Sequence, residues 1–168
     1  MKAIVYTSNT GYTARYAKML GEITALPVYE LDAACKMLEK GTSIIYLGWL
    51  FASMVKGYDK ASKRFAVKLL CGVGMCETGT LLEEVRKANR LPADLPLFTL
   101  QGGMDHGRLR GINKFMIRTL IRVMSAAKSP TENDKRKLQL IRDGGDYVSQ
   151  ENLAGVISWL KDKEAIHT

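Results

Sequence analysis

Five short apolar runs, spread evenly along the first hundred residues, constrain the fold of this chain more than any other feature. They occupy residues 3–6, 28–31, 44–47, 67–71 and 97–100. Most of them are continuous rather than alternating, which is typical of parallel strands covered on both faces. Because parallel strands need crossover connections and these are right-handed, we expect a doubly wound α/β fold with five parallel strands.

Helical periodicity separates and follows these runs. In the first helix Ala14, Ala17 and Leu20 share one face. Residues 80–90 predict another helix, in which Thr80 and Glu83 could form a capping box. A final helix starts near residue 149, and its apolar face consists of Leu153, Val156, Ile157 and Leu160. The chain of 168 residues has the length of one domain, residues 1–168.

Residues 102–146 interrupt the alternation and predict a helical insertion after the fifth strand. Ser129 and Pro130 separate two helical stretches, and Thr131 with Asp134 could cap the second of them. Residues 143–145, Asp-Gly-Gly, could end it. We therefore expect two helices that leave the sheet and return to it.

The excess positive charge of the chain is concentrated in this insertion. The net charge is +8, and residues 108–142 alone carry ten basic and two acidic side chains. Such a concentration indicates either a contact surface for an anionic partner or a solvated helix face.

The first helix of the insertion has basic residues at every fourth position, namely Arg110, Lys114, Arg118 and Arg122. At about 100° per residue they share one sector, while apolar residues occupy the rest of the circumference. Peripheral contact with an anionic membrane is one interpretation, and apolar packing on the sheet with solvated arginines is the other. A nucleic-acid partner is disfavoured because residues 108–142 contain one aromatic residue, Phe115.

Neither metal chemistry nor a disulfide framework is indicated. The chain has three cysteines without metal-ligand spacing and two histidines. It has no apolar stretch long enough to cross a bilayer, and its first residues become polar too early for a signal peptide. The sequence predicts a cytoplasmic protein, with peripheral attachment to the inner face of the membrane as a further option.

A loop rich in hydroxyl groups, residues 6–13, connects the first strand to the first helix. It contains serine or threonine at four positions and no basic residue. Backbone amides and hydroxyls at a helix N-terminus can hold a phosphate without lysine or arginine, and Gly11 permits close approach. Helix capping explains one such hydroxyl equally well. Four at the carboxyl end of a first strand favour phosphate binding.

This segment also carries a family resemblance. Residues 4–20 resemble the flavodoxin signature at Tyr6, Ser8, Gly11, Thr13, Ala17 and Leu20. The resemblance implies a flavodoxin-like five-stranded parallel sheet in the order 2-1-3-4-5, with FMN bound between strands one and three. It also implies the residues that hold the FMN phosphate: Ser8, Asn9, Thr10, Gly11, Tyr12 and Thr13.

Two further segments follow the family at the ends of the third and fourth strands. The resemblance implies that one side of the isoalloxazine ring is covered by Trp49, Leu50, Phe51, Ala52 and Ser53. It implies that the other side is lined by Gly72, Val73, Gly74 and Met75. Trp49 and Phe51 could equally be core residues, the commoner position of aromatics beside a strand.

The chain departs from electron-carrier flavodoxins, which are acidic, by its neutral core and its basic insertion. Both features resemble the menaquinone-dependent protoporphyrinogen oxidase family, which is flavodoxin-like and binds FMN. That resemblance implies an FMN-dependent oxidoreductase that passes electrons from an organic substrate, such as protoporphyrinogen, to a quinone-like acceptor. It identifies no catalytic residue, because the flavin performs the chemistry. The alternative is a flavodoxin-type electron carrier without a substrate of its own.

Overall fold

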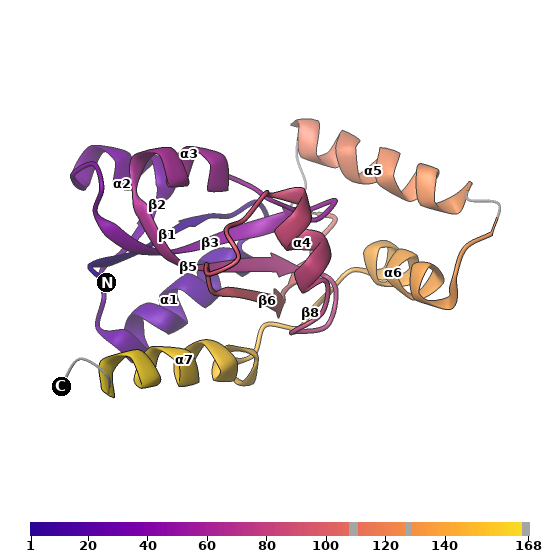
Figure 1. The fold of residues 1–168 in the computed structure, drawn as a ribbon. Helices are drawn as coiled ribbons and strands as arrows, with labels where there is room; N and C mark the ends of the chain where they lie inside the picture. Colours follow the sequence, from indigo (N-terminus) through magenta and orange to yellow (C-terminus); the bar gives the residue numbers. More distant parts are fainter. Residues whose placement is uncertain (108–110, 127–128, 166–168) are drawn as a thin grey trace.

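A mostly parallel β-sheet with helices on both faces forms the centre of the protein (Figure 1). The computed structural model describes residues 1–107, 111–126 and 129–165. The parallel strands are β1 (Ala3–Thr7), β2 (Val28–Glu30), β3 (Ser43–Phe51), β5 (Ala66–Gly74) and β6 (Leu97–Gln101). They lie across the sheet in the order β2-β1-β3-β5-β6. The α/β class and the parallel sheet expected from the sequence are confirmed.

Alternating residues of the strands point into two separate cores, one on each face of the sheet. In β1, Ala3 and Val5 point to one face and Ile4 to the other. The first core lies under α2 (Leu31–Met37), α3 (Tyr58–Arg64) and α4 (Leu82–Ala88). The second lies under α1 (Tyr12–Thr24) and α7 (Ala154–Ala165), on the opposite side of the sheet in Figure 1. Burial on both faces explains why the strand sequences are continuously apolar.

Most residues of the predicted helical faces are buried as expected, while Ala14 and Ile157 are only partly buried. Ala17 and Leu20 of α1 are fully buried in the second core. A short 3-10 helix, Gln150–Leu153, leads into α7, and Leu153, Val156 and Leu160 are buried against the same core. At the start of α2 the expectation was wrong: Leu31 is not the end of a strand but the first residue of the helix.

Two strands are longer than the apolar runs suggested. β3 continues to Phe51 and β5 to Gly74, because Gly48 and Trp49 of β3 pair with Gly72 and Val73 of β5. Beyond Phe51 the chain turns through Ala52 and Ser53, which have φ angles of 47° and 63°. It returns as β4 (Met54–Val55), which pairs antiparallel with the end of β3. The sheet therefore has a short sixth strand that the sequence did not predict.

Capping was predicted correctly for one helix and wrongly for another. α6 (Glu132–Asp143) begins with a capping box, in which Thr131 accepts from the Asp134 amide and the Asp134 carboxylate accepts from the Thr131 amide. Helix α4 has no side-chain cap. The Thr80 hydroxyl instead donates to the Glu77 carbonyl, at 2.6 Å, because the chain turns through a left-handed Leu81 before the helix starts.

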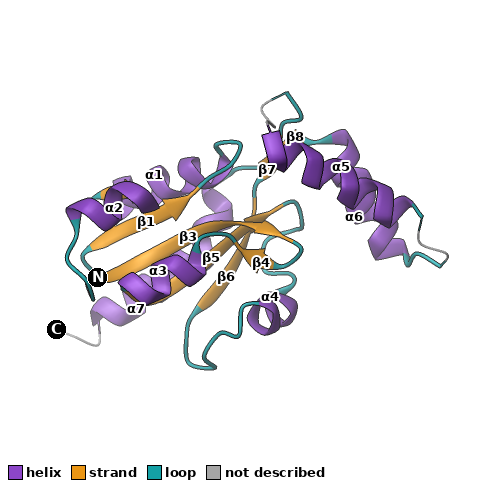
Figure 2. Cartoon of the chain, turned by 90° about the horizontal axis from the view of Figure 1, so that it is seen from above, coloured by secondary structure: helices purple, strands orange, loops and turns teal. Residues whose placement is uncertain are grey.

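The insertion leaves and rejoins the fold at one place. Its base is a two-stranded antiparallel sheet of β7 (Gly103–Met104) and β8 (Gly145–Asp146). Between them lie α5 (Gly111–Ser125) and α6, which project beyond the sheet (Figure 2). Within the described residues, no helix combines the length and apolarity needed to cross a membrane.

Candidate functional site

Two adjoining cavities lie where the parallel strands β1, β3 and β5 end. One has a volume of about 60 Å³ and the other about 240 Å³. They share the wall residues Leu50, Gly74, Met75, Met104 and Ile117. Because carboxyl ends of parallel strands meet at one edge, segments far apart in the sequence contribute to both cavities.

The smaller cavity is lined by residues from all three segments predicted to bind a cofactor. The loop before α1 and the first turn of α1 contribute Ser8, Asn9, Thr10, Tyr12 and Thr13. The ends of β3 and β5, with the residue after β5, contribute Trp49, Leu50, Val73, Gly74 and Met75. Gly103, Met104 and Ile117 complete the wall. Of the predicted residues, Gly11 and Gly72 line neither cavity: Gly11 is the N-cap of α1, and Gly72 is buried within β5.

The polar end of the smaller cavity is built by the N-terminus of α1. Gly11 has φ 98°, a left-handed conformation that glycine adopts without strain, and α1 starts at the next residue. The Ser8 hydroxyl accepts from the backbone amides of Gly11, at 3.2 Å, and Ala14, at 3.4 Å. Ser8 thus has the capping role considered from the sequence. The described lining contains no lysine, arginine or histidine, so helix amides and hydroxyls set its polarity.

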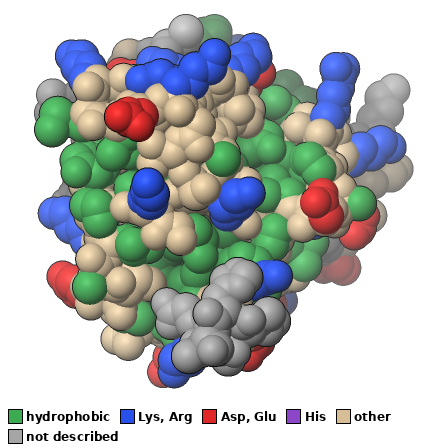
Figure 3. Space-filling model, turned by 60° about the vertical axis from the view of Figure 1, so that its left-hand side comes forward, with side chains coloured by type: hydrophobic (Ala, Val, Ile, Leu, Met, Phe, Trp, Pro, Cys, Tyr) green, Lys and Arg blue, Asp and Glu red, His purple; other side chains and the backbone are tan. Residues whose placement is uncertain are grey.

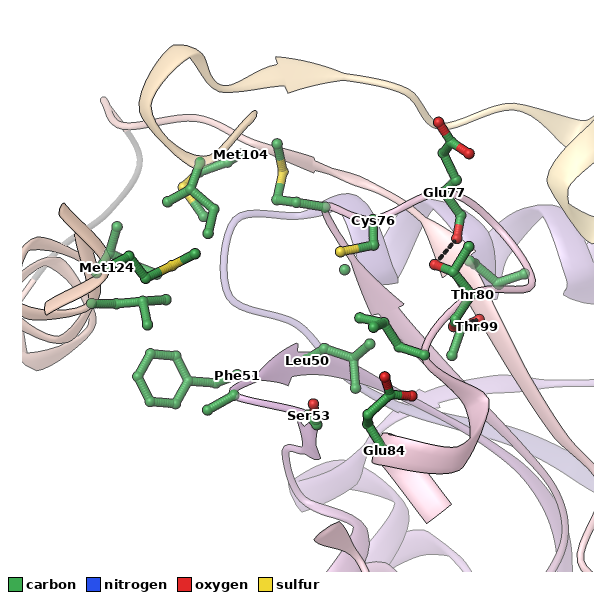
Figure 4. A pocket seen from close by; sticks show the side chains of 18 residues that line it. Leu50, Phe51, Ser53, Cys76, Glu77, Thr80, Glu84, Thr99, Met104 and Met124 are labelled. Atoms are coloured by element: carbon green, nitrogen blue, oxygen red, sulfur yellow. Dashed lines mark hydrogen bonds between the residues drawn. The ribbon is translucent and has the colours of Figure 1, made fainter. Parts of the chain in front are cut away.

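The larger cavity is mainly apolar (Figure 4). From the predicted segments it takes Leu50, Phe51, Ala52, Ser53, Gly74 and Met75. Thioether and thiol groups from Met75, Met104, Met124 and Cys76 give it a polarisable wall. Its charged lining residues are two carboxylates, Glu77 and Glu84. Flat apolar ligands suit such a wall.

The insertion supplies the roof of the larger cavity. Ile117, Leu120 and Met124 of α5 and Ile141 of α6 line it. An ion pair joins this roof to the sheet, since Arg136 of α6 lies 2.6 Å from the Glu77 carboxylate. Sequence reasoning missed these residues as part of a site. The spacing of Ile117, Leu120 and Met124 indicated a common helical face, but not what that face would cover.

Trp49 and Phe51 form an exposed aromatic pair at the end of β3. Both side chains are partly exposed, and their rings meet edge to face with centroids 6.2 Å apart. The Lys56 ammonium lies 5.8 Å from the Trp49 ring centroid and 5.5 Å from that of Phe51. Neither ring is a core residue, so both remain accessible to a ligand.

A buried tyrosine of β3 connects the end of β1 with the segment that follows β4. The Tyr46 hydroxyl donates to the Lys56 carbonyl at 2.9 Å and accepts from the Thr7 hydroxyl at 2.7 Å. Burial raises the pKa of Tyr46, so the hydroxyl keeps its proton. Gly57, with φ 82°, leaves room for this contact, because a Cβ there would lie 2.1 Å from the Tyr46 oxygen.

The base of the insertion is attached to the first turn of helix α1. Arg15 of α1 pairs with Asp146 of β8, and its guanidinium lies 6.0 Å from the Tyr12 ring centroid. The Tyr12 ring also packs against Gly103, where a Cβ would lie 2.7 Å from a ring carbon. Tyr12 thus contacts both the smaller cavity and the insertion.

The most deeply buried thiol, that of Cys71, is not available for nucleophilic chemistry. Cys71 is fully buried in β5, and desolvation raises the pKa of its thiol far above the ordinary value. Among the described residues, no group of three or more histidine, cysteine or acidic side chains could hold a metal ion.

Taken together, the two cavities suit an elongated ligand with an anionic end and a flat apolar end. Comparisons with protein-family models, with curated proteins and with solved structures found no match to this chain.

Proposed function

We propose that this chain binds FMN and is an oxidoreductase that passes electrons from an organic substrate to a quinone-like acceptor. The observation that carries the proposal is a small cavity with a polar end at a helix N-terminus, joined to a larger apolar cavity. FMN has the matching shape, with a phosphate at one end and a planar ring system at the other.

The strand order supports a flavodoxin-like topology. With the short hairpin strand β4 left out, β2-β1-β3-β5-β6 corresponds to the order 2-1-3-4-5. In such sheets ligands bind where the strand order reverses, here between β1 and β3. The cavities lie at the ends of these strands, and residues 4–20 carry the resemblance to flavodoxins.

The residues present fit the cofactor. Ser8, Asn9, Thr10 and Thr13 would bind the phosphate with hydroxyls and amides, aided by the dipole of α1. The segments at the ends of β3 and β5 would cover the ring. When bound, FMN would supply the electron-transfer chemistry, and the chain would orient it and exclude water.

The roof over the larger cavity favours an enzyme over an electron carrier. A carrier needs an exposed flavin edge to meet its protein partners, whereas α5 and α6 cover the apolar cavity. A covered apolar space beside the ring suits a small organic substrate. Protoporphyrinogen as donor and a menaquinone-like acceptor follow from the family resemblance and are proposed on that basis.

A titration with FMN and with riboflavin tests the cofactor. FMN is expected to bind and to change its absorbance on binding. Thr10→Asp puts a carboxylate beside the phosphate position and should weaken FMN binding by at least about tenfold. Riboflavin has no phosphate, so the same substitution should weaken its binding much less. Ser62→Asp, at an exposed position of α3, is the matched control. If neither compound binds the unmodified chain, the proposal is rejected.

Turnover separates the enzyme from the carrier. The FMN-loaded chain should oxidise protoporphyrinogen in the presence of a menaquinone analogue without any other protein. Electron transfer that occurs only with a reductase partner would favour the carrier instead.

A further inference from the structure

Helix α5 has one side on the cavity and the opposite side in solvent. Ile117, Leu120 and Met124 line the larger cavity. At about 100° per residue these three fall within a sector of about 60°. The outer side of the helix therefore has no role in roofing the cavity.

That outer side combines cations with exposed apolar groups. Lys114, Arg118 and Arg122 are all exposed and share a sector of about 80°. Beside them, Phe115 is 70% exposed and Val123 is 64% exposed, although α6 packs against the same helix. These five residues form what we call the outer face of α5. It lies directly opposite the sector that contacts the cavity.

The outer face carries no compensating negative charge. Helix α5, GINKFMIRTLIRVMS, contains no acidic residue. A helix that only covered the fold would turn residues such as Phe115 inward. Exposed apolar side chains flanked by cations are typical of helices that lie in the interface of a membrane.

We propose that the outer face of α5 docks on an anionic lipid surface. Phe115 and Val123 enter the boundary between headgroups and acyl chains, and Lys114, Arg118 and Arg122 meet the lipid phosphates. At 15 residues the helix is about 22 Å long, shorter than the hydrocarbon core of about 30 Å, so it lies on the surface. Arg110, the fourth basic residue of the sequence pattern, lies outside the described residues.

Charge complementarity favours lipid over other partners. A second copy of the chain would bring the same cations together and repel. A nucleic acid or an acidic protein would pair with the cations, but the exposed Phe115 and Val123 would then add little. An anionic membrane uses both groups of side chains.

Sedimentation with lipid vesicles tests this proposal. The chain should bind vesicles of phosphatidylcholine mixed with phosphatidylglycerol much more tightly than vesicles of phosphatidylcholine alone. Replacing Lys114, Arg118 and Arg122 together with glutamine should weaken binding to the mixed vesicles by about a hundredfold, about fivefold for each residue.

A control must remove the same charge elsewhere, because Lys and Arg side chains also lie scattered over the face of the molecule that Figure 3 draws. Lys18 of α1 with Lys161 and Lys163 of α7, all exposed, serve this purpose when changed to glutamine. The control variant should bind the mixed vesicles less than about fivefold more weakly than the unmodified chain. Equal losses in the two triple variants would overturn the proposal, because the effect would then be one of net charge.

A second variant tests the apolar part of the outer face. Phe115→Ser with Val123→Ser keeps every cation and should weaken binding to the mixed vesicles by about tenfold or more. Unchanged binding of this double variant would overturn the proposal, as would duplex DNA that binds α5 as tightly as the mixed vesicles do. All altered positions are exposed, and lipid binding is read without reference to FMN, so the test is independent of the proposed cofactor.

Discussion

Replacing Tyr46 with phenylalanine removes a single oxygen atom from the contact between the end of β1 and β3. The phenol has one hydrogen, which it donates to the Lys56 carbonyl, so the Thr7 hydroxyl donates to the phenol. The ring itself is fully buried in the core and would stay in place. The substitution therefore tests the two hydrogen bonds rather than the packing.

The expected loss of stability depends on the two groups that lose their hydrogen-bond partner. The Lys56 carbonyl loses its tyrosine donor, and an unsatisfied buried group costs about 1–3 kcal/mol. The Thr7 hydroxyl is only half-buried and can turn towards water, so losing its tyrosine partner costs less, about 0.5–1 kcal/mol. We expect the free energy of unfolding to fall by about 1.5–4 kcal/mol in total.

Urea denaturation without cofactor measures this change. Tyr29→Phe is the matched control, because Tyr29 packs against the same core and makes no side-chain hydrogen bond with the described residues. It should change the free energy of unfolding by less than about 0.5 kcal/mol. A loss below that value for Tyr46→Phe, or equal losses in both variants, would refute the reasoning.

Gly57→Ala probes the same contact from the other side. Its Cβ would lie 2.1 Å from the Tyr46 oxygen and 2.5 Å from the Thr7 oxygen, and φ 82° strains any other residue. We expect Gly57→Ala to lower the free energy of unfolding by about 2–4 kcal/mol. The loss should be smaller when Tyr46 is already phenylalanine, because the nearest clash is then gone.

Two further predictions concern the roof and the buried thiol. Arg136→Gln breaks the ion pair of α6 with Glu77 and should speed alkylation of Cys76, which lines the cavity, by up to about fivefold in a Cys35→Ser background. Lys135 pairs with Glu132 on the same helix, so Lys135→Gln should leave the alkylation rate of Cys76 unchanged. Equal rates in the two variants would contradict the idea that Arg136 holds the roof in place. Because burial raises the pKa of Cys71, the unfolded chain loses that proton first. The stability that the protonated Cys71 thiol gives the fold is therefore complete below about pH 8.5, the ordinary pKa of cysteine, and falls as the pH rises above it. Cys71→Ala should remove this part of the pH dependence in urea titrations, and an unchanged slope would contradict it.

Local patterns in the sequence predicted much of the architecture and part of the site. Continuous apolar runs predicted parallel strands, and Thr131 with Asp134 predicted the start of α6, because these signals act within a few residues. The hydroxyl-rich segment of residues 6–13 was expected to lead into a helix N-terminus, and α1 begins within it, at Tyr12. The FMN assignment itself stays a prediction.

Capping at Thr80 and the extent of β3 and β5 were harder to predict. The turn through Leu81 and the pairing of Gly48 and Trp49 with the neighbouring strand depend on contacts between segments. Whether Trp49 and Phe51 join the core or stay exposed was likewise undecided from their positions alone, because either outcome is compatible with a strand end.

By itself, then, the sequence determined the order of elements, the parallel sheet and the position of the hydroxyl-rich loop, since each depends on near neighbours in the chain. Only the tertiary structure decided that α5 roofs the larger cavity while its outer face stays exposed, and that Arg136 reaches Glu77 across 59 positions. A helix that is apolar around much of its circumference can pack on the rest of the protein with more than one of its sides. The choice rests on which surface the returning chain brings near it, and no local pattern encodes that surface.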